Sequence, residues 1–389
     1  MNTNLILLSQ EEYSLRLHRI QQYLSDAGID CAVISSMANL YYLTGRVFCG
    51  YAIVTPVSDT RFYVKRPVHL TGADITHVHK PEEMAPAFET THNVGLELAS
   101  LSYNMAQRLI KITRTAADIS GILALARSRK TAHEIALITV SGAKHERVYR
   151  KIPMLYRPGM SDVELQIEIE RVSRLEGCLG QFRIAGSEME LHMGNVLAGD
   201  NADAPSPYDF AMGGAGADPS LPVGADGTII RPGMSVMVDM NGNFTGYMTD
   251  MTRTFSLGQI SDEAMKAHRL SIDICRTLAD MGRAGTRASD LYDRALQMAK
   301  DAGLDHYFMG HRQHAAFVGH GLGIEINELP VISPRSRDIL APGNVIALEP
   351  KFVIPGTGAV GVENTYVVTH DGPMECLTRA PQDIIPFDK

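Results

Sequence analysis

The chain has 389 residues, of which 45% are hydrophobic, so two packed units are expected rather than one small core. Acidic residues outnumber basic ones, 44 Asp and Glu against 36 Lys and Arg, and no basic run interrupts that balance. This composition argues against nucleic acid as a partner. The five cysteines are scattered and never closely paired, which indicates a reducing compartment rather than a disulfide framework or a zinc site.

The N-terminal half reads as an α/β domain. Residues 1–8 carry no basic leader, and no later apolar run approaches membrane-spanning length, so we expect a cytoplasmic protein with no membrane partner. Ser9 and Glu12 form a capping-box pattern, and apolar residues at helical spacing follow it. Short runs rich in β-forming residues then alternate with helix-like segments. These runs are 31–34, 52–57, 62–64 and 94–98.

The second domain is expected to begin with helices. A helical pattern over 103–132 runs into a long amphipathic stretch at 132–150, and we place the domain boundary after Leu125, giving domains 1–125 and 126–389. Ser161 and Glu164 form a second capping box. The glycine cluster at 213–216 lacks a following Lys-Ser/Thr pair, so it predicts a turn rather than a phosphate-binding loop.

Two aspartates stand on a predicted hairpin. Residues 235–240 read as a buried strand that carries Asp239, and the Asn- and Gly-rich segment 241–246 can reverse the chain into a second strand that carries Asp250. Two carboxylates facing one point require a cation. The alternative is that Asp239 merely ends a strand and Asp250 pairs with Arg253 at the surface.

Three further residues favour the cation. His320 lies between glycines in 319–323, where backbone can pack closely around the imidazole, as suits a ligand. Glu349 and Glu363 each follow an apolar strand run, where a buried charge needs a counter-ion. The four carboxylates balance two divalent cations, and a neutral imidazole adds a ligand. Manganese, cobalt, zinc or iron suits such oxygen-rich ligation, and paired ions about 3.5–4 Å apart can hold a bridging hydroxide.

These five residues, in this order and in these contexts, resemble the pita-bread metallopeptidase family, which includes methionine aminopeptidase, prolidase, Xaa-Pro aminopeptidase and creatinase. The strings at 249–255 (Thr-Asp-Met-Thr-Arg-Thr-Phe) and 319–323 (Gly-His-Gly-Leu-Gly) and the pair Glu349-Pro350 are most similar to the proline-directed branch. The segment 39–45 (Asn-Leu-Tyr-Tyr-Leu-Thr-Gly) resembles the N-terminal domain of creatinase and prolidase. The implied fold is an α/β creatinase-like domain followed by an α+β pita-bread catalytic domain.

The resemblance also implies roles. Asp239 would bind one metal ion, Asp250 and Glu363 would bridge both, and His320 with Glu349 would bind the other. Glu349 would in addition relay a proton from the bridging water. The implied assembly is a homodimer.

The chain departs from the family pattern at three places. Val223 follows Leu221-Pro222 where family peptidases carry a histidine, Asn327 stands where they carry another, and Gly361 precedes Val362-Glu363 where an arginine is usual. The Asn327 amide can still donate a hydrogen bond to a substrate carbonyl, so we predict a catalytic role for it beside Glu349. Three other histidines are candidates for contacting substrate. They are His192, His311 and His314.

The leading hypothesis is a dinuclear, metal-dependent hydrolase of the Xaa-Pro type, an aminopeptidase or dipeptidase that acts on a small peptide or amide. Two alternatives stay open. One is a non-peptidase enzyme of the same fold, a small-metabolite amide hydrolase or lyase. The other is a non-catalytic binding module, against which the presence of all five ligand residues argues.

Overall fold

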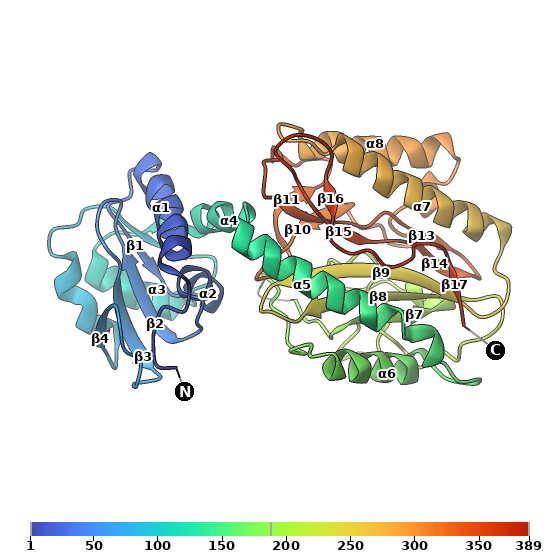
Figure 1. Ribbon diagram of the computed structural model, residues 1–389, viewed down its shortest axis with the longest axis horizontal. Helices are drawn as coiled ribbons and strands as arrows, with labels where there is room; N and C mark the ends of the chain where they lie inside the picture. The colour runs from blue at the N-terminus through green and yellow to red at the C-terminus, as the bar shows by residue number, and fades with distance from the viewer. Residues whose placement is uncertain (1, 187–188, 388–389) are drawn as a thin grey trace. The chain divides into compact units, whose positions relative to one another are not determined.

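The computed structural model describes residues 2–186 and 189–387. It separates into two compact units, residues 1–127 and 128–389, which are described one at a time. The domain boundary predicted from the sequence lies after Leu125. Figure 1 shows a small mixed sheet with helices in the first unit and long strands flanked by helices in the second.

The first unit is an α/β domain built on a six-stranded sheet of order β4-β3-β2-β1-β5-β6. Strands β1–β2 and β2–β3 pair antiparallel, and the other neighbouring pairs are parallel. Its strands are β1 (Cys31–Ile34), β2 (Cys49–Val54), β3 (Arg61–Arg66), β4 (Asp74–His77), β5 (Val94–Leu96) and β6 (Ala117–Asp118). Its helices are α1 (Gln10–Asp26), α2 (Met37–Thr44), the 3₁₀ helix η1 (Pro81–Phe88), α3 (Tyr103–Thr113) and α4 (Ser120–Ser128), the last of which runs one residue past the boundary.

Local sequence signals explain where the first helices begin. The Ser9 hydroxyl accepts the backbone N–H of Glu12 at 3.2 Å, so α1 begins where the capping pattern predicted. Helix α2 ends at Gly45, whose φ of 73° lies in the left-handed region that favours glycine. The predicted strands at 31–34, 52–57, 62–64 and 94–98 correspond to β1, β2, β3 and β5, whereas the short strands β4 and β6 were not predicted.

The second unit has the α+β pita-bread architecture, with helices on the outer faces of its strands (Figure 1). Its strands are β7 (Gly194–Ala198), β8 (Ser235–Asn243), β9 (Met248–Ser256), β10 (Gly319–Gly321), β11 (Glu328–Ile332), β12 (Val345–Leu348), β13 (Lys351–Ile354), β14 (Gly358–Gly361), β15 (Asn364–Val367), β16 (Glu375–Cys376) and β17 (Ile385–Pro386). Its helices are α5 (Ala132–Tyr149), η2 (Ile152–Met154), α6 (Asp162–Leu175), η3 (Gly199–Asp203), α7 (Asp262–Met281), α8 (Ala288–Asp301) and η4 (Asp305–Tyr307). The α6 capping box forms as predicted, with reciprocal bonds of 3.2 and 2.8 Å between Ser161 and Glu164.

The strands of this unit form three groups: β17-β9-β8-β7, β11-β10-β12-β15-β16, and the hairpin β13-β14. Helices α5 and α6 pack on β7, β8 and β9, whereas α7 packs on β13 and β14 and α8 packs on β11. One apolar core therefore lies under α5 and α6 and another under α7 and α8. The strands between these two cores carry the polar residues described next.

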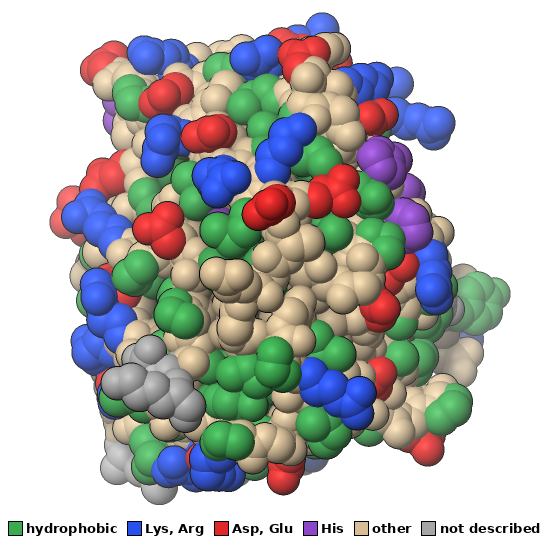
Figure 2. Space-filling model, turned by 90° about the vertical axis from the view of Figure 1, so that its right-hand side faces the viewer, with side chains coloured by type: hydrophobic (Ala, Val, Ile, Leu, Met, Phe, Trp, Pro, Cys, Tyr) green, Lys and Arg blue, Asp and Glu red, His purple; other side chains and the backbone are tan. Residues whose placement is uncertain are grey.

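Acidic and basic side chains are interspersed with hydrophobic ones on the face drawn in Figure 2, so that face carries no extended field of one sign. Among the residues that the structure describes, no helix combines the length and apolar character that crossing a bilayer requires.

Candidate active site and metal centre

The β8–β9 hairpin aims two aspartates to the same side of the sheet. Asp239 pairs with Thr252 and Asn241 pairs with Asp250 in its antiparallel register. Paired residues share a face, and Asn241 lies two positions from Asp239, so Asp239 and Asp250 are diagonal neighbours on one face. The strands extend further than predicted, since β8 continues to Asn243 and the chain reverses only at residues 244–247.

His320 lies in the middle of β10, between two glycines that allow close packing. A Cβ on Gly319 would stand 2.4 Å from the Ala347 carbonyl oxygen, and one on Gly321 would stand 2.1 Å from that of Leu329. The His320 Nδ1 lies 3.1 Å from the carbonyl oxygen of Gly321, which can only accept a hydrogen bond. Nδ1 therefore donates its proton to Gly321, which leaves Nε2 as the ring nitrogen that faces the neighbouring carboxylates and could bind a metal ion.

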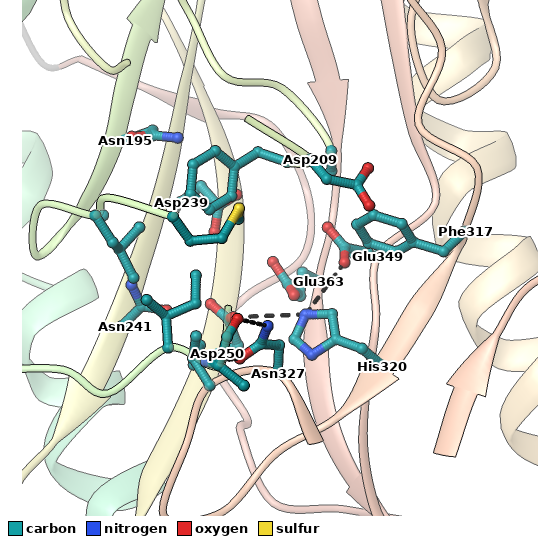
Figure 3. A pocket seen from close by; sticks show the side chains of 18 of the residues that line it. Asn195, Asp209, Asp239, Asn241, Asp250, Phe317, His320, Asn327, Glu349 and Glu363 are labelled. Atoms are coloured by element: carbon teal, nitrogen blue, oxygen red, sulfur yellow. Dashed lines mark hydrogen bonds and ion pairs between the residues drawn. The ribbon is translucent and has the colours of Figure 1, made fainter. Parts of the chain in front are cut away.

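Glu349 follows β12 and Glu363 precedes β15, and both side chains are buried beside His320. The His320 Nε2 lies 3.4 Å from Glu349 Oε1 and 3.9 Å from Asp250 Oδ2 (Figure 3). Glu363 Oε2 accepts the Thr252 hydroxyl at 2.7 Å. Among the described residues no hydrogen-bond donor reaches Glu363 Oε1 or Glu349 Oε1, although both atoms are buried. Buried carboxylate oxygens of this kind call for a cation or a proton.

Arg253 is a framework residue, so the alternative of a surface pair between Asp250 and Arg253 is not observed. Its guanidinium is fully buried and donates to the carbonyl oxygens of Thr252 and Glu363 at 2.7 and 2.8 Å. Its other hydrogen bonds go to the carbonyl oxygens of Pro381 and Ala380 and to the Asn364 amide. Arg253 thereby ties β9 to the segment that carries Glu363.

Lys351 is a member of the cluster that was not predicted from the sequence. Its Nζ lies 2.8 Å from Asp239 Oδ2, 2.8 Å from Glu349 Oε2 and 3.2 Å from Glu363 Oε2, and its side chain is 1% exposed. A lysine that directly follows Glu349-Pro350 and opens an apolar strand was the signal that could have revealed it.

The cluster holds more negative than positive charge, and the pKa values of its members reflect this. Burial raises the pKa of Asp250 well above its usual range, and the charges of Glu363, Asp239 and Glu349 raise it further. Burial likewise raises the pKa of Glu363 to about 8, although Lys351 opposes that rise. Burial also acts on Glu349, but Lys351 and His320 outweigh it and lower its pKa to about 2. Burial alone would lower the pKa of His320, but Glu349 raises it to about 9.

Two overlapping groups of side chains could hold metal ions. In one, Asp250, His320 and Glu363 each offer a ligand atom within 4.8 Å of the others, and the same holds for Asp239, Glu349 and Glu363 in the second. The first group fits a divalent cation, because it combines an imidazole nitrogen with carboxylates and lies beside the unpartnered Glu363 Oε1. In the second group, one oxygen of each carboxylate is already bonded to Lys351.

A cavity of about 360 Å³ opens onto the cluster. Its lining combines four of the carboxylates and His320 with apolar and amide side chains (Figure 3). Phe210, Phe317 and Ile326 supply apolar surface, and Asp209 adds a further carboxylate. None of the described lining residues is a lysine or an arginine. The size suits a small molecule or a short peptide end rather than a folded protein segment.

Of the predicted substrate residues, only Asn327 lines this cavity. Its Oδ1 accepts the backbone N–H of Ala185 at 2.6 Å, and its Nδ2 donates to the Ala185 carbonyl oxygen at 2.9 Å. The amide thus ties the backbone at Ala185 to the residue that precedes β11, which gives it a positioning task. An oxyanion role for Asn327 stays a prediction.

The three candidate histidines do not line the cavity. His192 lies near Gly224, His311 Nδ1 lies 3.0 Å from Asp203 Oδ2, and His314 Nδ1 lies 2.9 Å from the carbonyl oxygen of Phe308. Local loop contacts therefore account for these side chains. Val223 is buried and is likewise absent from the lining.

The fold and this donor set define a two-domain protein of the creatinase/prolidase type. Residues 136–370 match the model of metallopeptidase family M24, and residues 16–129 match that of the creatinase/prolidase N-terminal domain. The chain belongs to metallopeptidase family M24 and is a peptidase-type hydrolase by that membership. The predicted family and fold class are confirmed.

The similarity to known proteins covers nearly the whole chain. An uncharacterised peptidase of Bacillus subtilis is 26% identical, covering 95% of this chain and 99% of the relative. The Xaa-Pro dipeptidase of Pyrococcus furiosus is 23% identical over the same shares. Among solved structures, an Xaa-Pro dipeptidase from Bacillus anthracis has a TM-score of 0.81 at 22% identity, covering 96% of this chain and 99% of the other. An X-Pro aminopeptidase from Thermotoga maritima has a TM-score of 0.75 at 20% identity, covering 95% and 99%. At these identities the structural likeness establishes the fold alone.

Proposed function

We propose that the chain is a metal-dependent hydrolase of the Xaa-Pro type that cleaves small amide or peptide substrates bound in the cavity. The observation that carries this proposal is the convergence of Asp250, His320 and Glu363 at the floor of the cavity, with Glu349 beside them. A cluster of buried acids with unpartnered oxygens destabilises a fold unless it holds a cation, so its presence favours function over packing.

The side chains around the cluster have definable tasks. Asp250, His320 and Glu363 would hold a divalent cation, which when bound polarises a carbonyl and makes water more acidic. Glu349 would accept a proton at Oε1, which no hydrogen-bond donor among the described residues occupies, and return it to the leaving nitrogen. Phe317 and Ile326 would exclude water from the reacting atoms.

The charge of the cavity narrows the substrate class. Asp209 and the cluster offer negative charge, whereas the described lining has no lysine or arginine to pair with a carboxylate. A free Xaa-Pro dipeptide brings a terminal carboxylate into such a site without a cationic partner, which is unfavourable. The lining therefore supports aminopeptidase-like action on substrates whose far end is an amide, over dipeptidase action.

Kinetics on a matched pair of substrates test whether the enzyme prefers an amide to a free carboxylate at the far end of the substrate. With Mn²⁺ added, Ala-Pro amide should be cleaved at the Ala-Pro bond with a kcat/KM at least about 10-fold above that of Ala-Pro, since one uncompensated charge costs more than about 1.4 kcal/mol. Asp209→Asn should raise KM for substrates with a free amino group and leave an N-acetylated amide unaffected. Preference for the free dipeptide would contradict the aminopeptidase assignment.

A non-peptidase enzyme of the same fold is the second candidate. Val223, Asn327 and Gly361 stand where family peptidases carry histidines and an arginine, and Asn327 is engaged with Ala185. Metal-loaded protein that turns over no Xaa-Pro compound but does turn over small non-peptide amides would favour this candidate. A chain that retains no metal and gains no activity when metal is added would instead indicate a binding module.

Three finer points belong to the same proposal. Manganese, cobalt, zinc or iron suits the donor set, and metal analysis of protein purified without chelator would identify the ion. The five cysteines form no disulfide, which supports a cytoplasmic location. A homodimer is proposed from the family likeness, and light scattering would measure it.

A further inference from the structure

A buried ammonium group lies inside the acidic cluster. The Lys351 Nζ bonds to one oxygen from each of three carboxylates, Asp239, Glu349 and Glu363, at 2.8 to 3.2 Å. These three are also the second group of side chains that could hold a metal ion. A metal ion and the Lys351 ammonium would therefore compete for one position among these carboxylates.

The backbone places Lys351 there firmly. It opens β13, which pairs with β14 from Lys351 opposite Gly361 to Ile354 opposite Gly358. A Cβ on Gly361 would stand 2.7 Å from the Pro350 carbonyl oxygen and 3.0 Å from the Lys351 Cα, so the two strands are in close contact at this point. The Lys351 side chain is 1% exposed, so it is not a surface arm that can swing into solvent.

Both geometry and charge disfavour the binding of a second metal ion beside the ammonium. A divalent ion binds carboxylate oxygens at about 2.0–2.2 Å, which would bring it against the Nζ that contacts the same carboxylates. Two cations that share the same carboxylates repel each other strongly in a buried site. The Lys351 Nζ has a carboxylate oxygen within 2.8 to 3.2 Å on each of three sides, an arrangement that favours the charged ammonium.

We propose that the Lys351 ammonium takes the place of one cation of the expected pair, leaving a centre for a single ion at Asp250, His320 and Glu363. This inference rests on the proposed metal-dependent function. Four carboxylates, one ammonium and one divalent ion together carry one net negative charge. Four carboxylates with two divalent ions and no ammonium would carry none. A negative centre beside Asp209 suits substrates that carry a cationic group, in line with the absence of lysine and arginine from the described lining.

Metal counting tests the inference directly. Protein loaded with Mn²⁺, desalted and analysed by mass spectrometry should contain one ion per chain. Lys351→Met frees three carboxylates and should contain two. Lys130→Met is the matched control, because Lys130 is another buried lysine in this unit, bonded to Glu328 at 3.0 Å, and it should stay at one.

Spectroscopy and thermal unfolding give readouts that do not depend on turnover. Electron paramagnetic resonance should show an isolated Mn²⁺ in the wild type and an exchange-coupled pair in Lys351→Met. Without metal, that variant should melt below the wild type, and Mn²⁺ should raise its Tm by more, because more negative charge is left to be compensated. Lys351→Gln, which keeps a hydrogen-bond donor, is expected to take two ions as well and serves if the methionine variant does not fold.

The outcomes separate this inference from the proposed function. Two ions per chain in the wild type, with a coupled signal, would overturn the role of Lys351 and leave the metal-dependent hydrolase standing. No ion in the wild type or in either Lys351 variant would contradict the metal centre itself, and the proposed function with it. One ion in both the wild type and the Lys351 variants would show that Lys351 does not exclude the second ion.

Discussion

Glu97 of the first unit and the acidic cluster of the second unit are both buried, but their carboxylates differ in how many hydrogen-bond donors surround them. In the first unit, Glu97 is 2% exposed, and its oxygens accept the backbone N–H groups of Ser35 and Ser36, the Ser35 hydroxyl and the Asn39 amide. In the second unit, Glu349 and Glu363 are as deeply buried, but each has an oxygen with no donor among the described residues. A saturated carboxylate stabilises a fold, whereas an unsaturated one signals a ligand.

The contrast also holds inside the catalytic unit. Glu328 forms an ion pair with Lys130 and accepts the backbone N–H groups of Ile324 and Glu325, each bond measuring 3.0 Å. Lys351 instead contacts three carboxylates, so the cluster remains acidic even with its lysine in place. The ratio of carboxylates to cations, rather than burial alone, distinguishes the site from the scaffold.

The largest effect is expected from removing a carboxylate that faces the proposed ion. Asp250→Ala and Glu363→Ala should each abolish metal retention and lower turnover by more than the roughly 10²–10³-fold associated with losing one hydrogen-bond donor. The fold should survive at moderate temperature. Full metal content with normal turnover in either variant would show that these oxygens are not ligands.

Removing only the charge of Glu349 should separate chemistry from binding. Glu349→Gln should lower kcat by roughly 10²–10⁴-fold, the range of general acid–base catalysis, while KM changes much less. Steady-state kinetics measure both, with the exposed Glu263→Gln as the control. A weaker KM at unchanged kcat would mean that Glu349 positions substrate and moves no proton.

The saturated carboxylate of the first unit should affect stability and not metal. Glu97→Ala leaves the N–H groups at the start of α2 without their acceptor, so we expect a loss of roughly 2–4 kcal/mol from the free energy of unfolding of that unit. Urea unfolding measures it, and the exposed Glu89→Ala should change little. An altered Mn²⁺ content in Glu97→Ala would break the distinction between the two kinds of carboxylate.

The smallest effect is expected from His145, a buried histidine that stays neutral, and it appears as a pH dependence of the free energy of unfolding. Burial lowers the pKa of His145 to about 3, below the value of about 6.5 in an unfolded chain, and the Arg253 charge adds to this. The unfolded state therefore binds the proton first, so stability falls as the pH drops below about 6.5 and continues to fall toward pH 3. By pH 5 the loss should reach roughly 2 kcal/mol. His145→Gln should flatten this dependence in unfolding experiments, and an unchanged slope would contradict it.

The sequence predicted the fold and the members of the cluster through their local contexts. The sequence alone shows three of these contexts: the hairpin with Asp239 and Asp250, the glycines around His320, and the strand runs before Glu349 and Glu363. The register of β8 and β9 was not predicted, because it depends on the residue at which the Asn- and Gly-rich segment reverses the chain. Lys351 was missed for a related reason: a lysine in a strand is ordinarily read as an edge or surface residue, and only the fold reveals the three carboxylates around it.

The substrate residues were the hardest to predict. His192, His311 and His314 lie in loops whose placement depends on contacts with Gly224, Asp203 and Phe308. Glycine-rich loops carry little periodic signal, so proximity in sequence to the cluster did not imply a place in the cavity.

Anomalous X-ray diffraction from crystals grown with Mn²⁺ tests the central claim most directly. We expect a single strong peak within bonding distance of Asp250, His320 and Glu363, with the Lys351 side chain among Asp239, Glu349 and Glu363 and no peak at its Nζ. A map with these side chains in the same arrangement and no anomalous peak among them would contradict the metal centre.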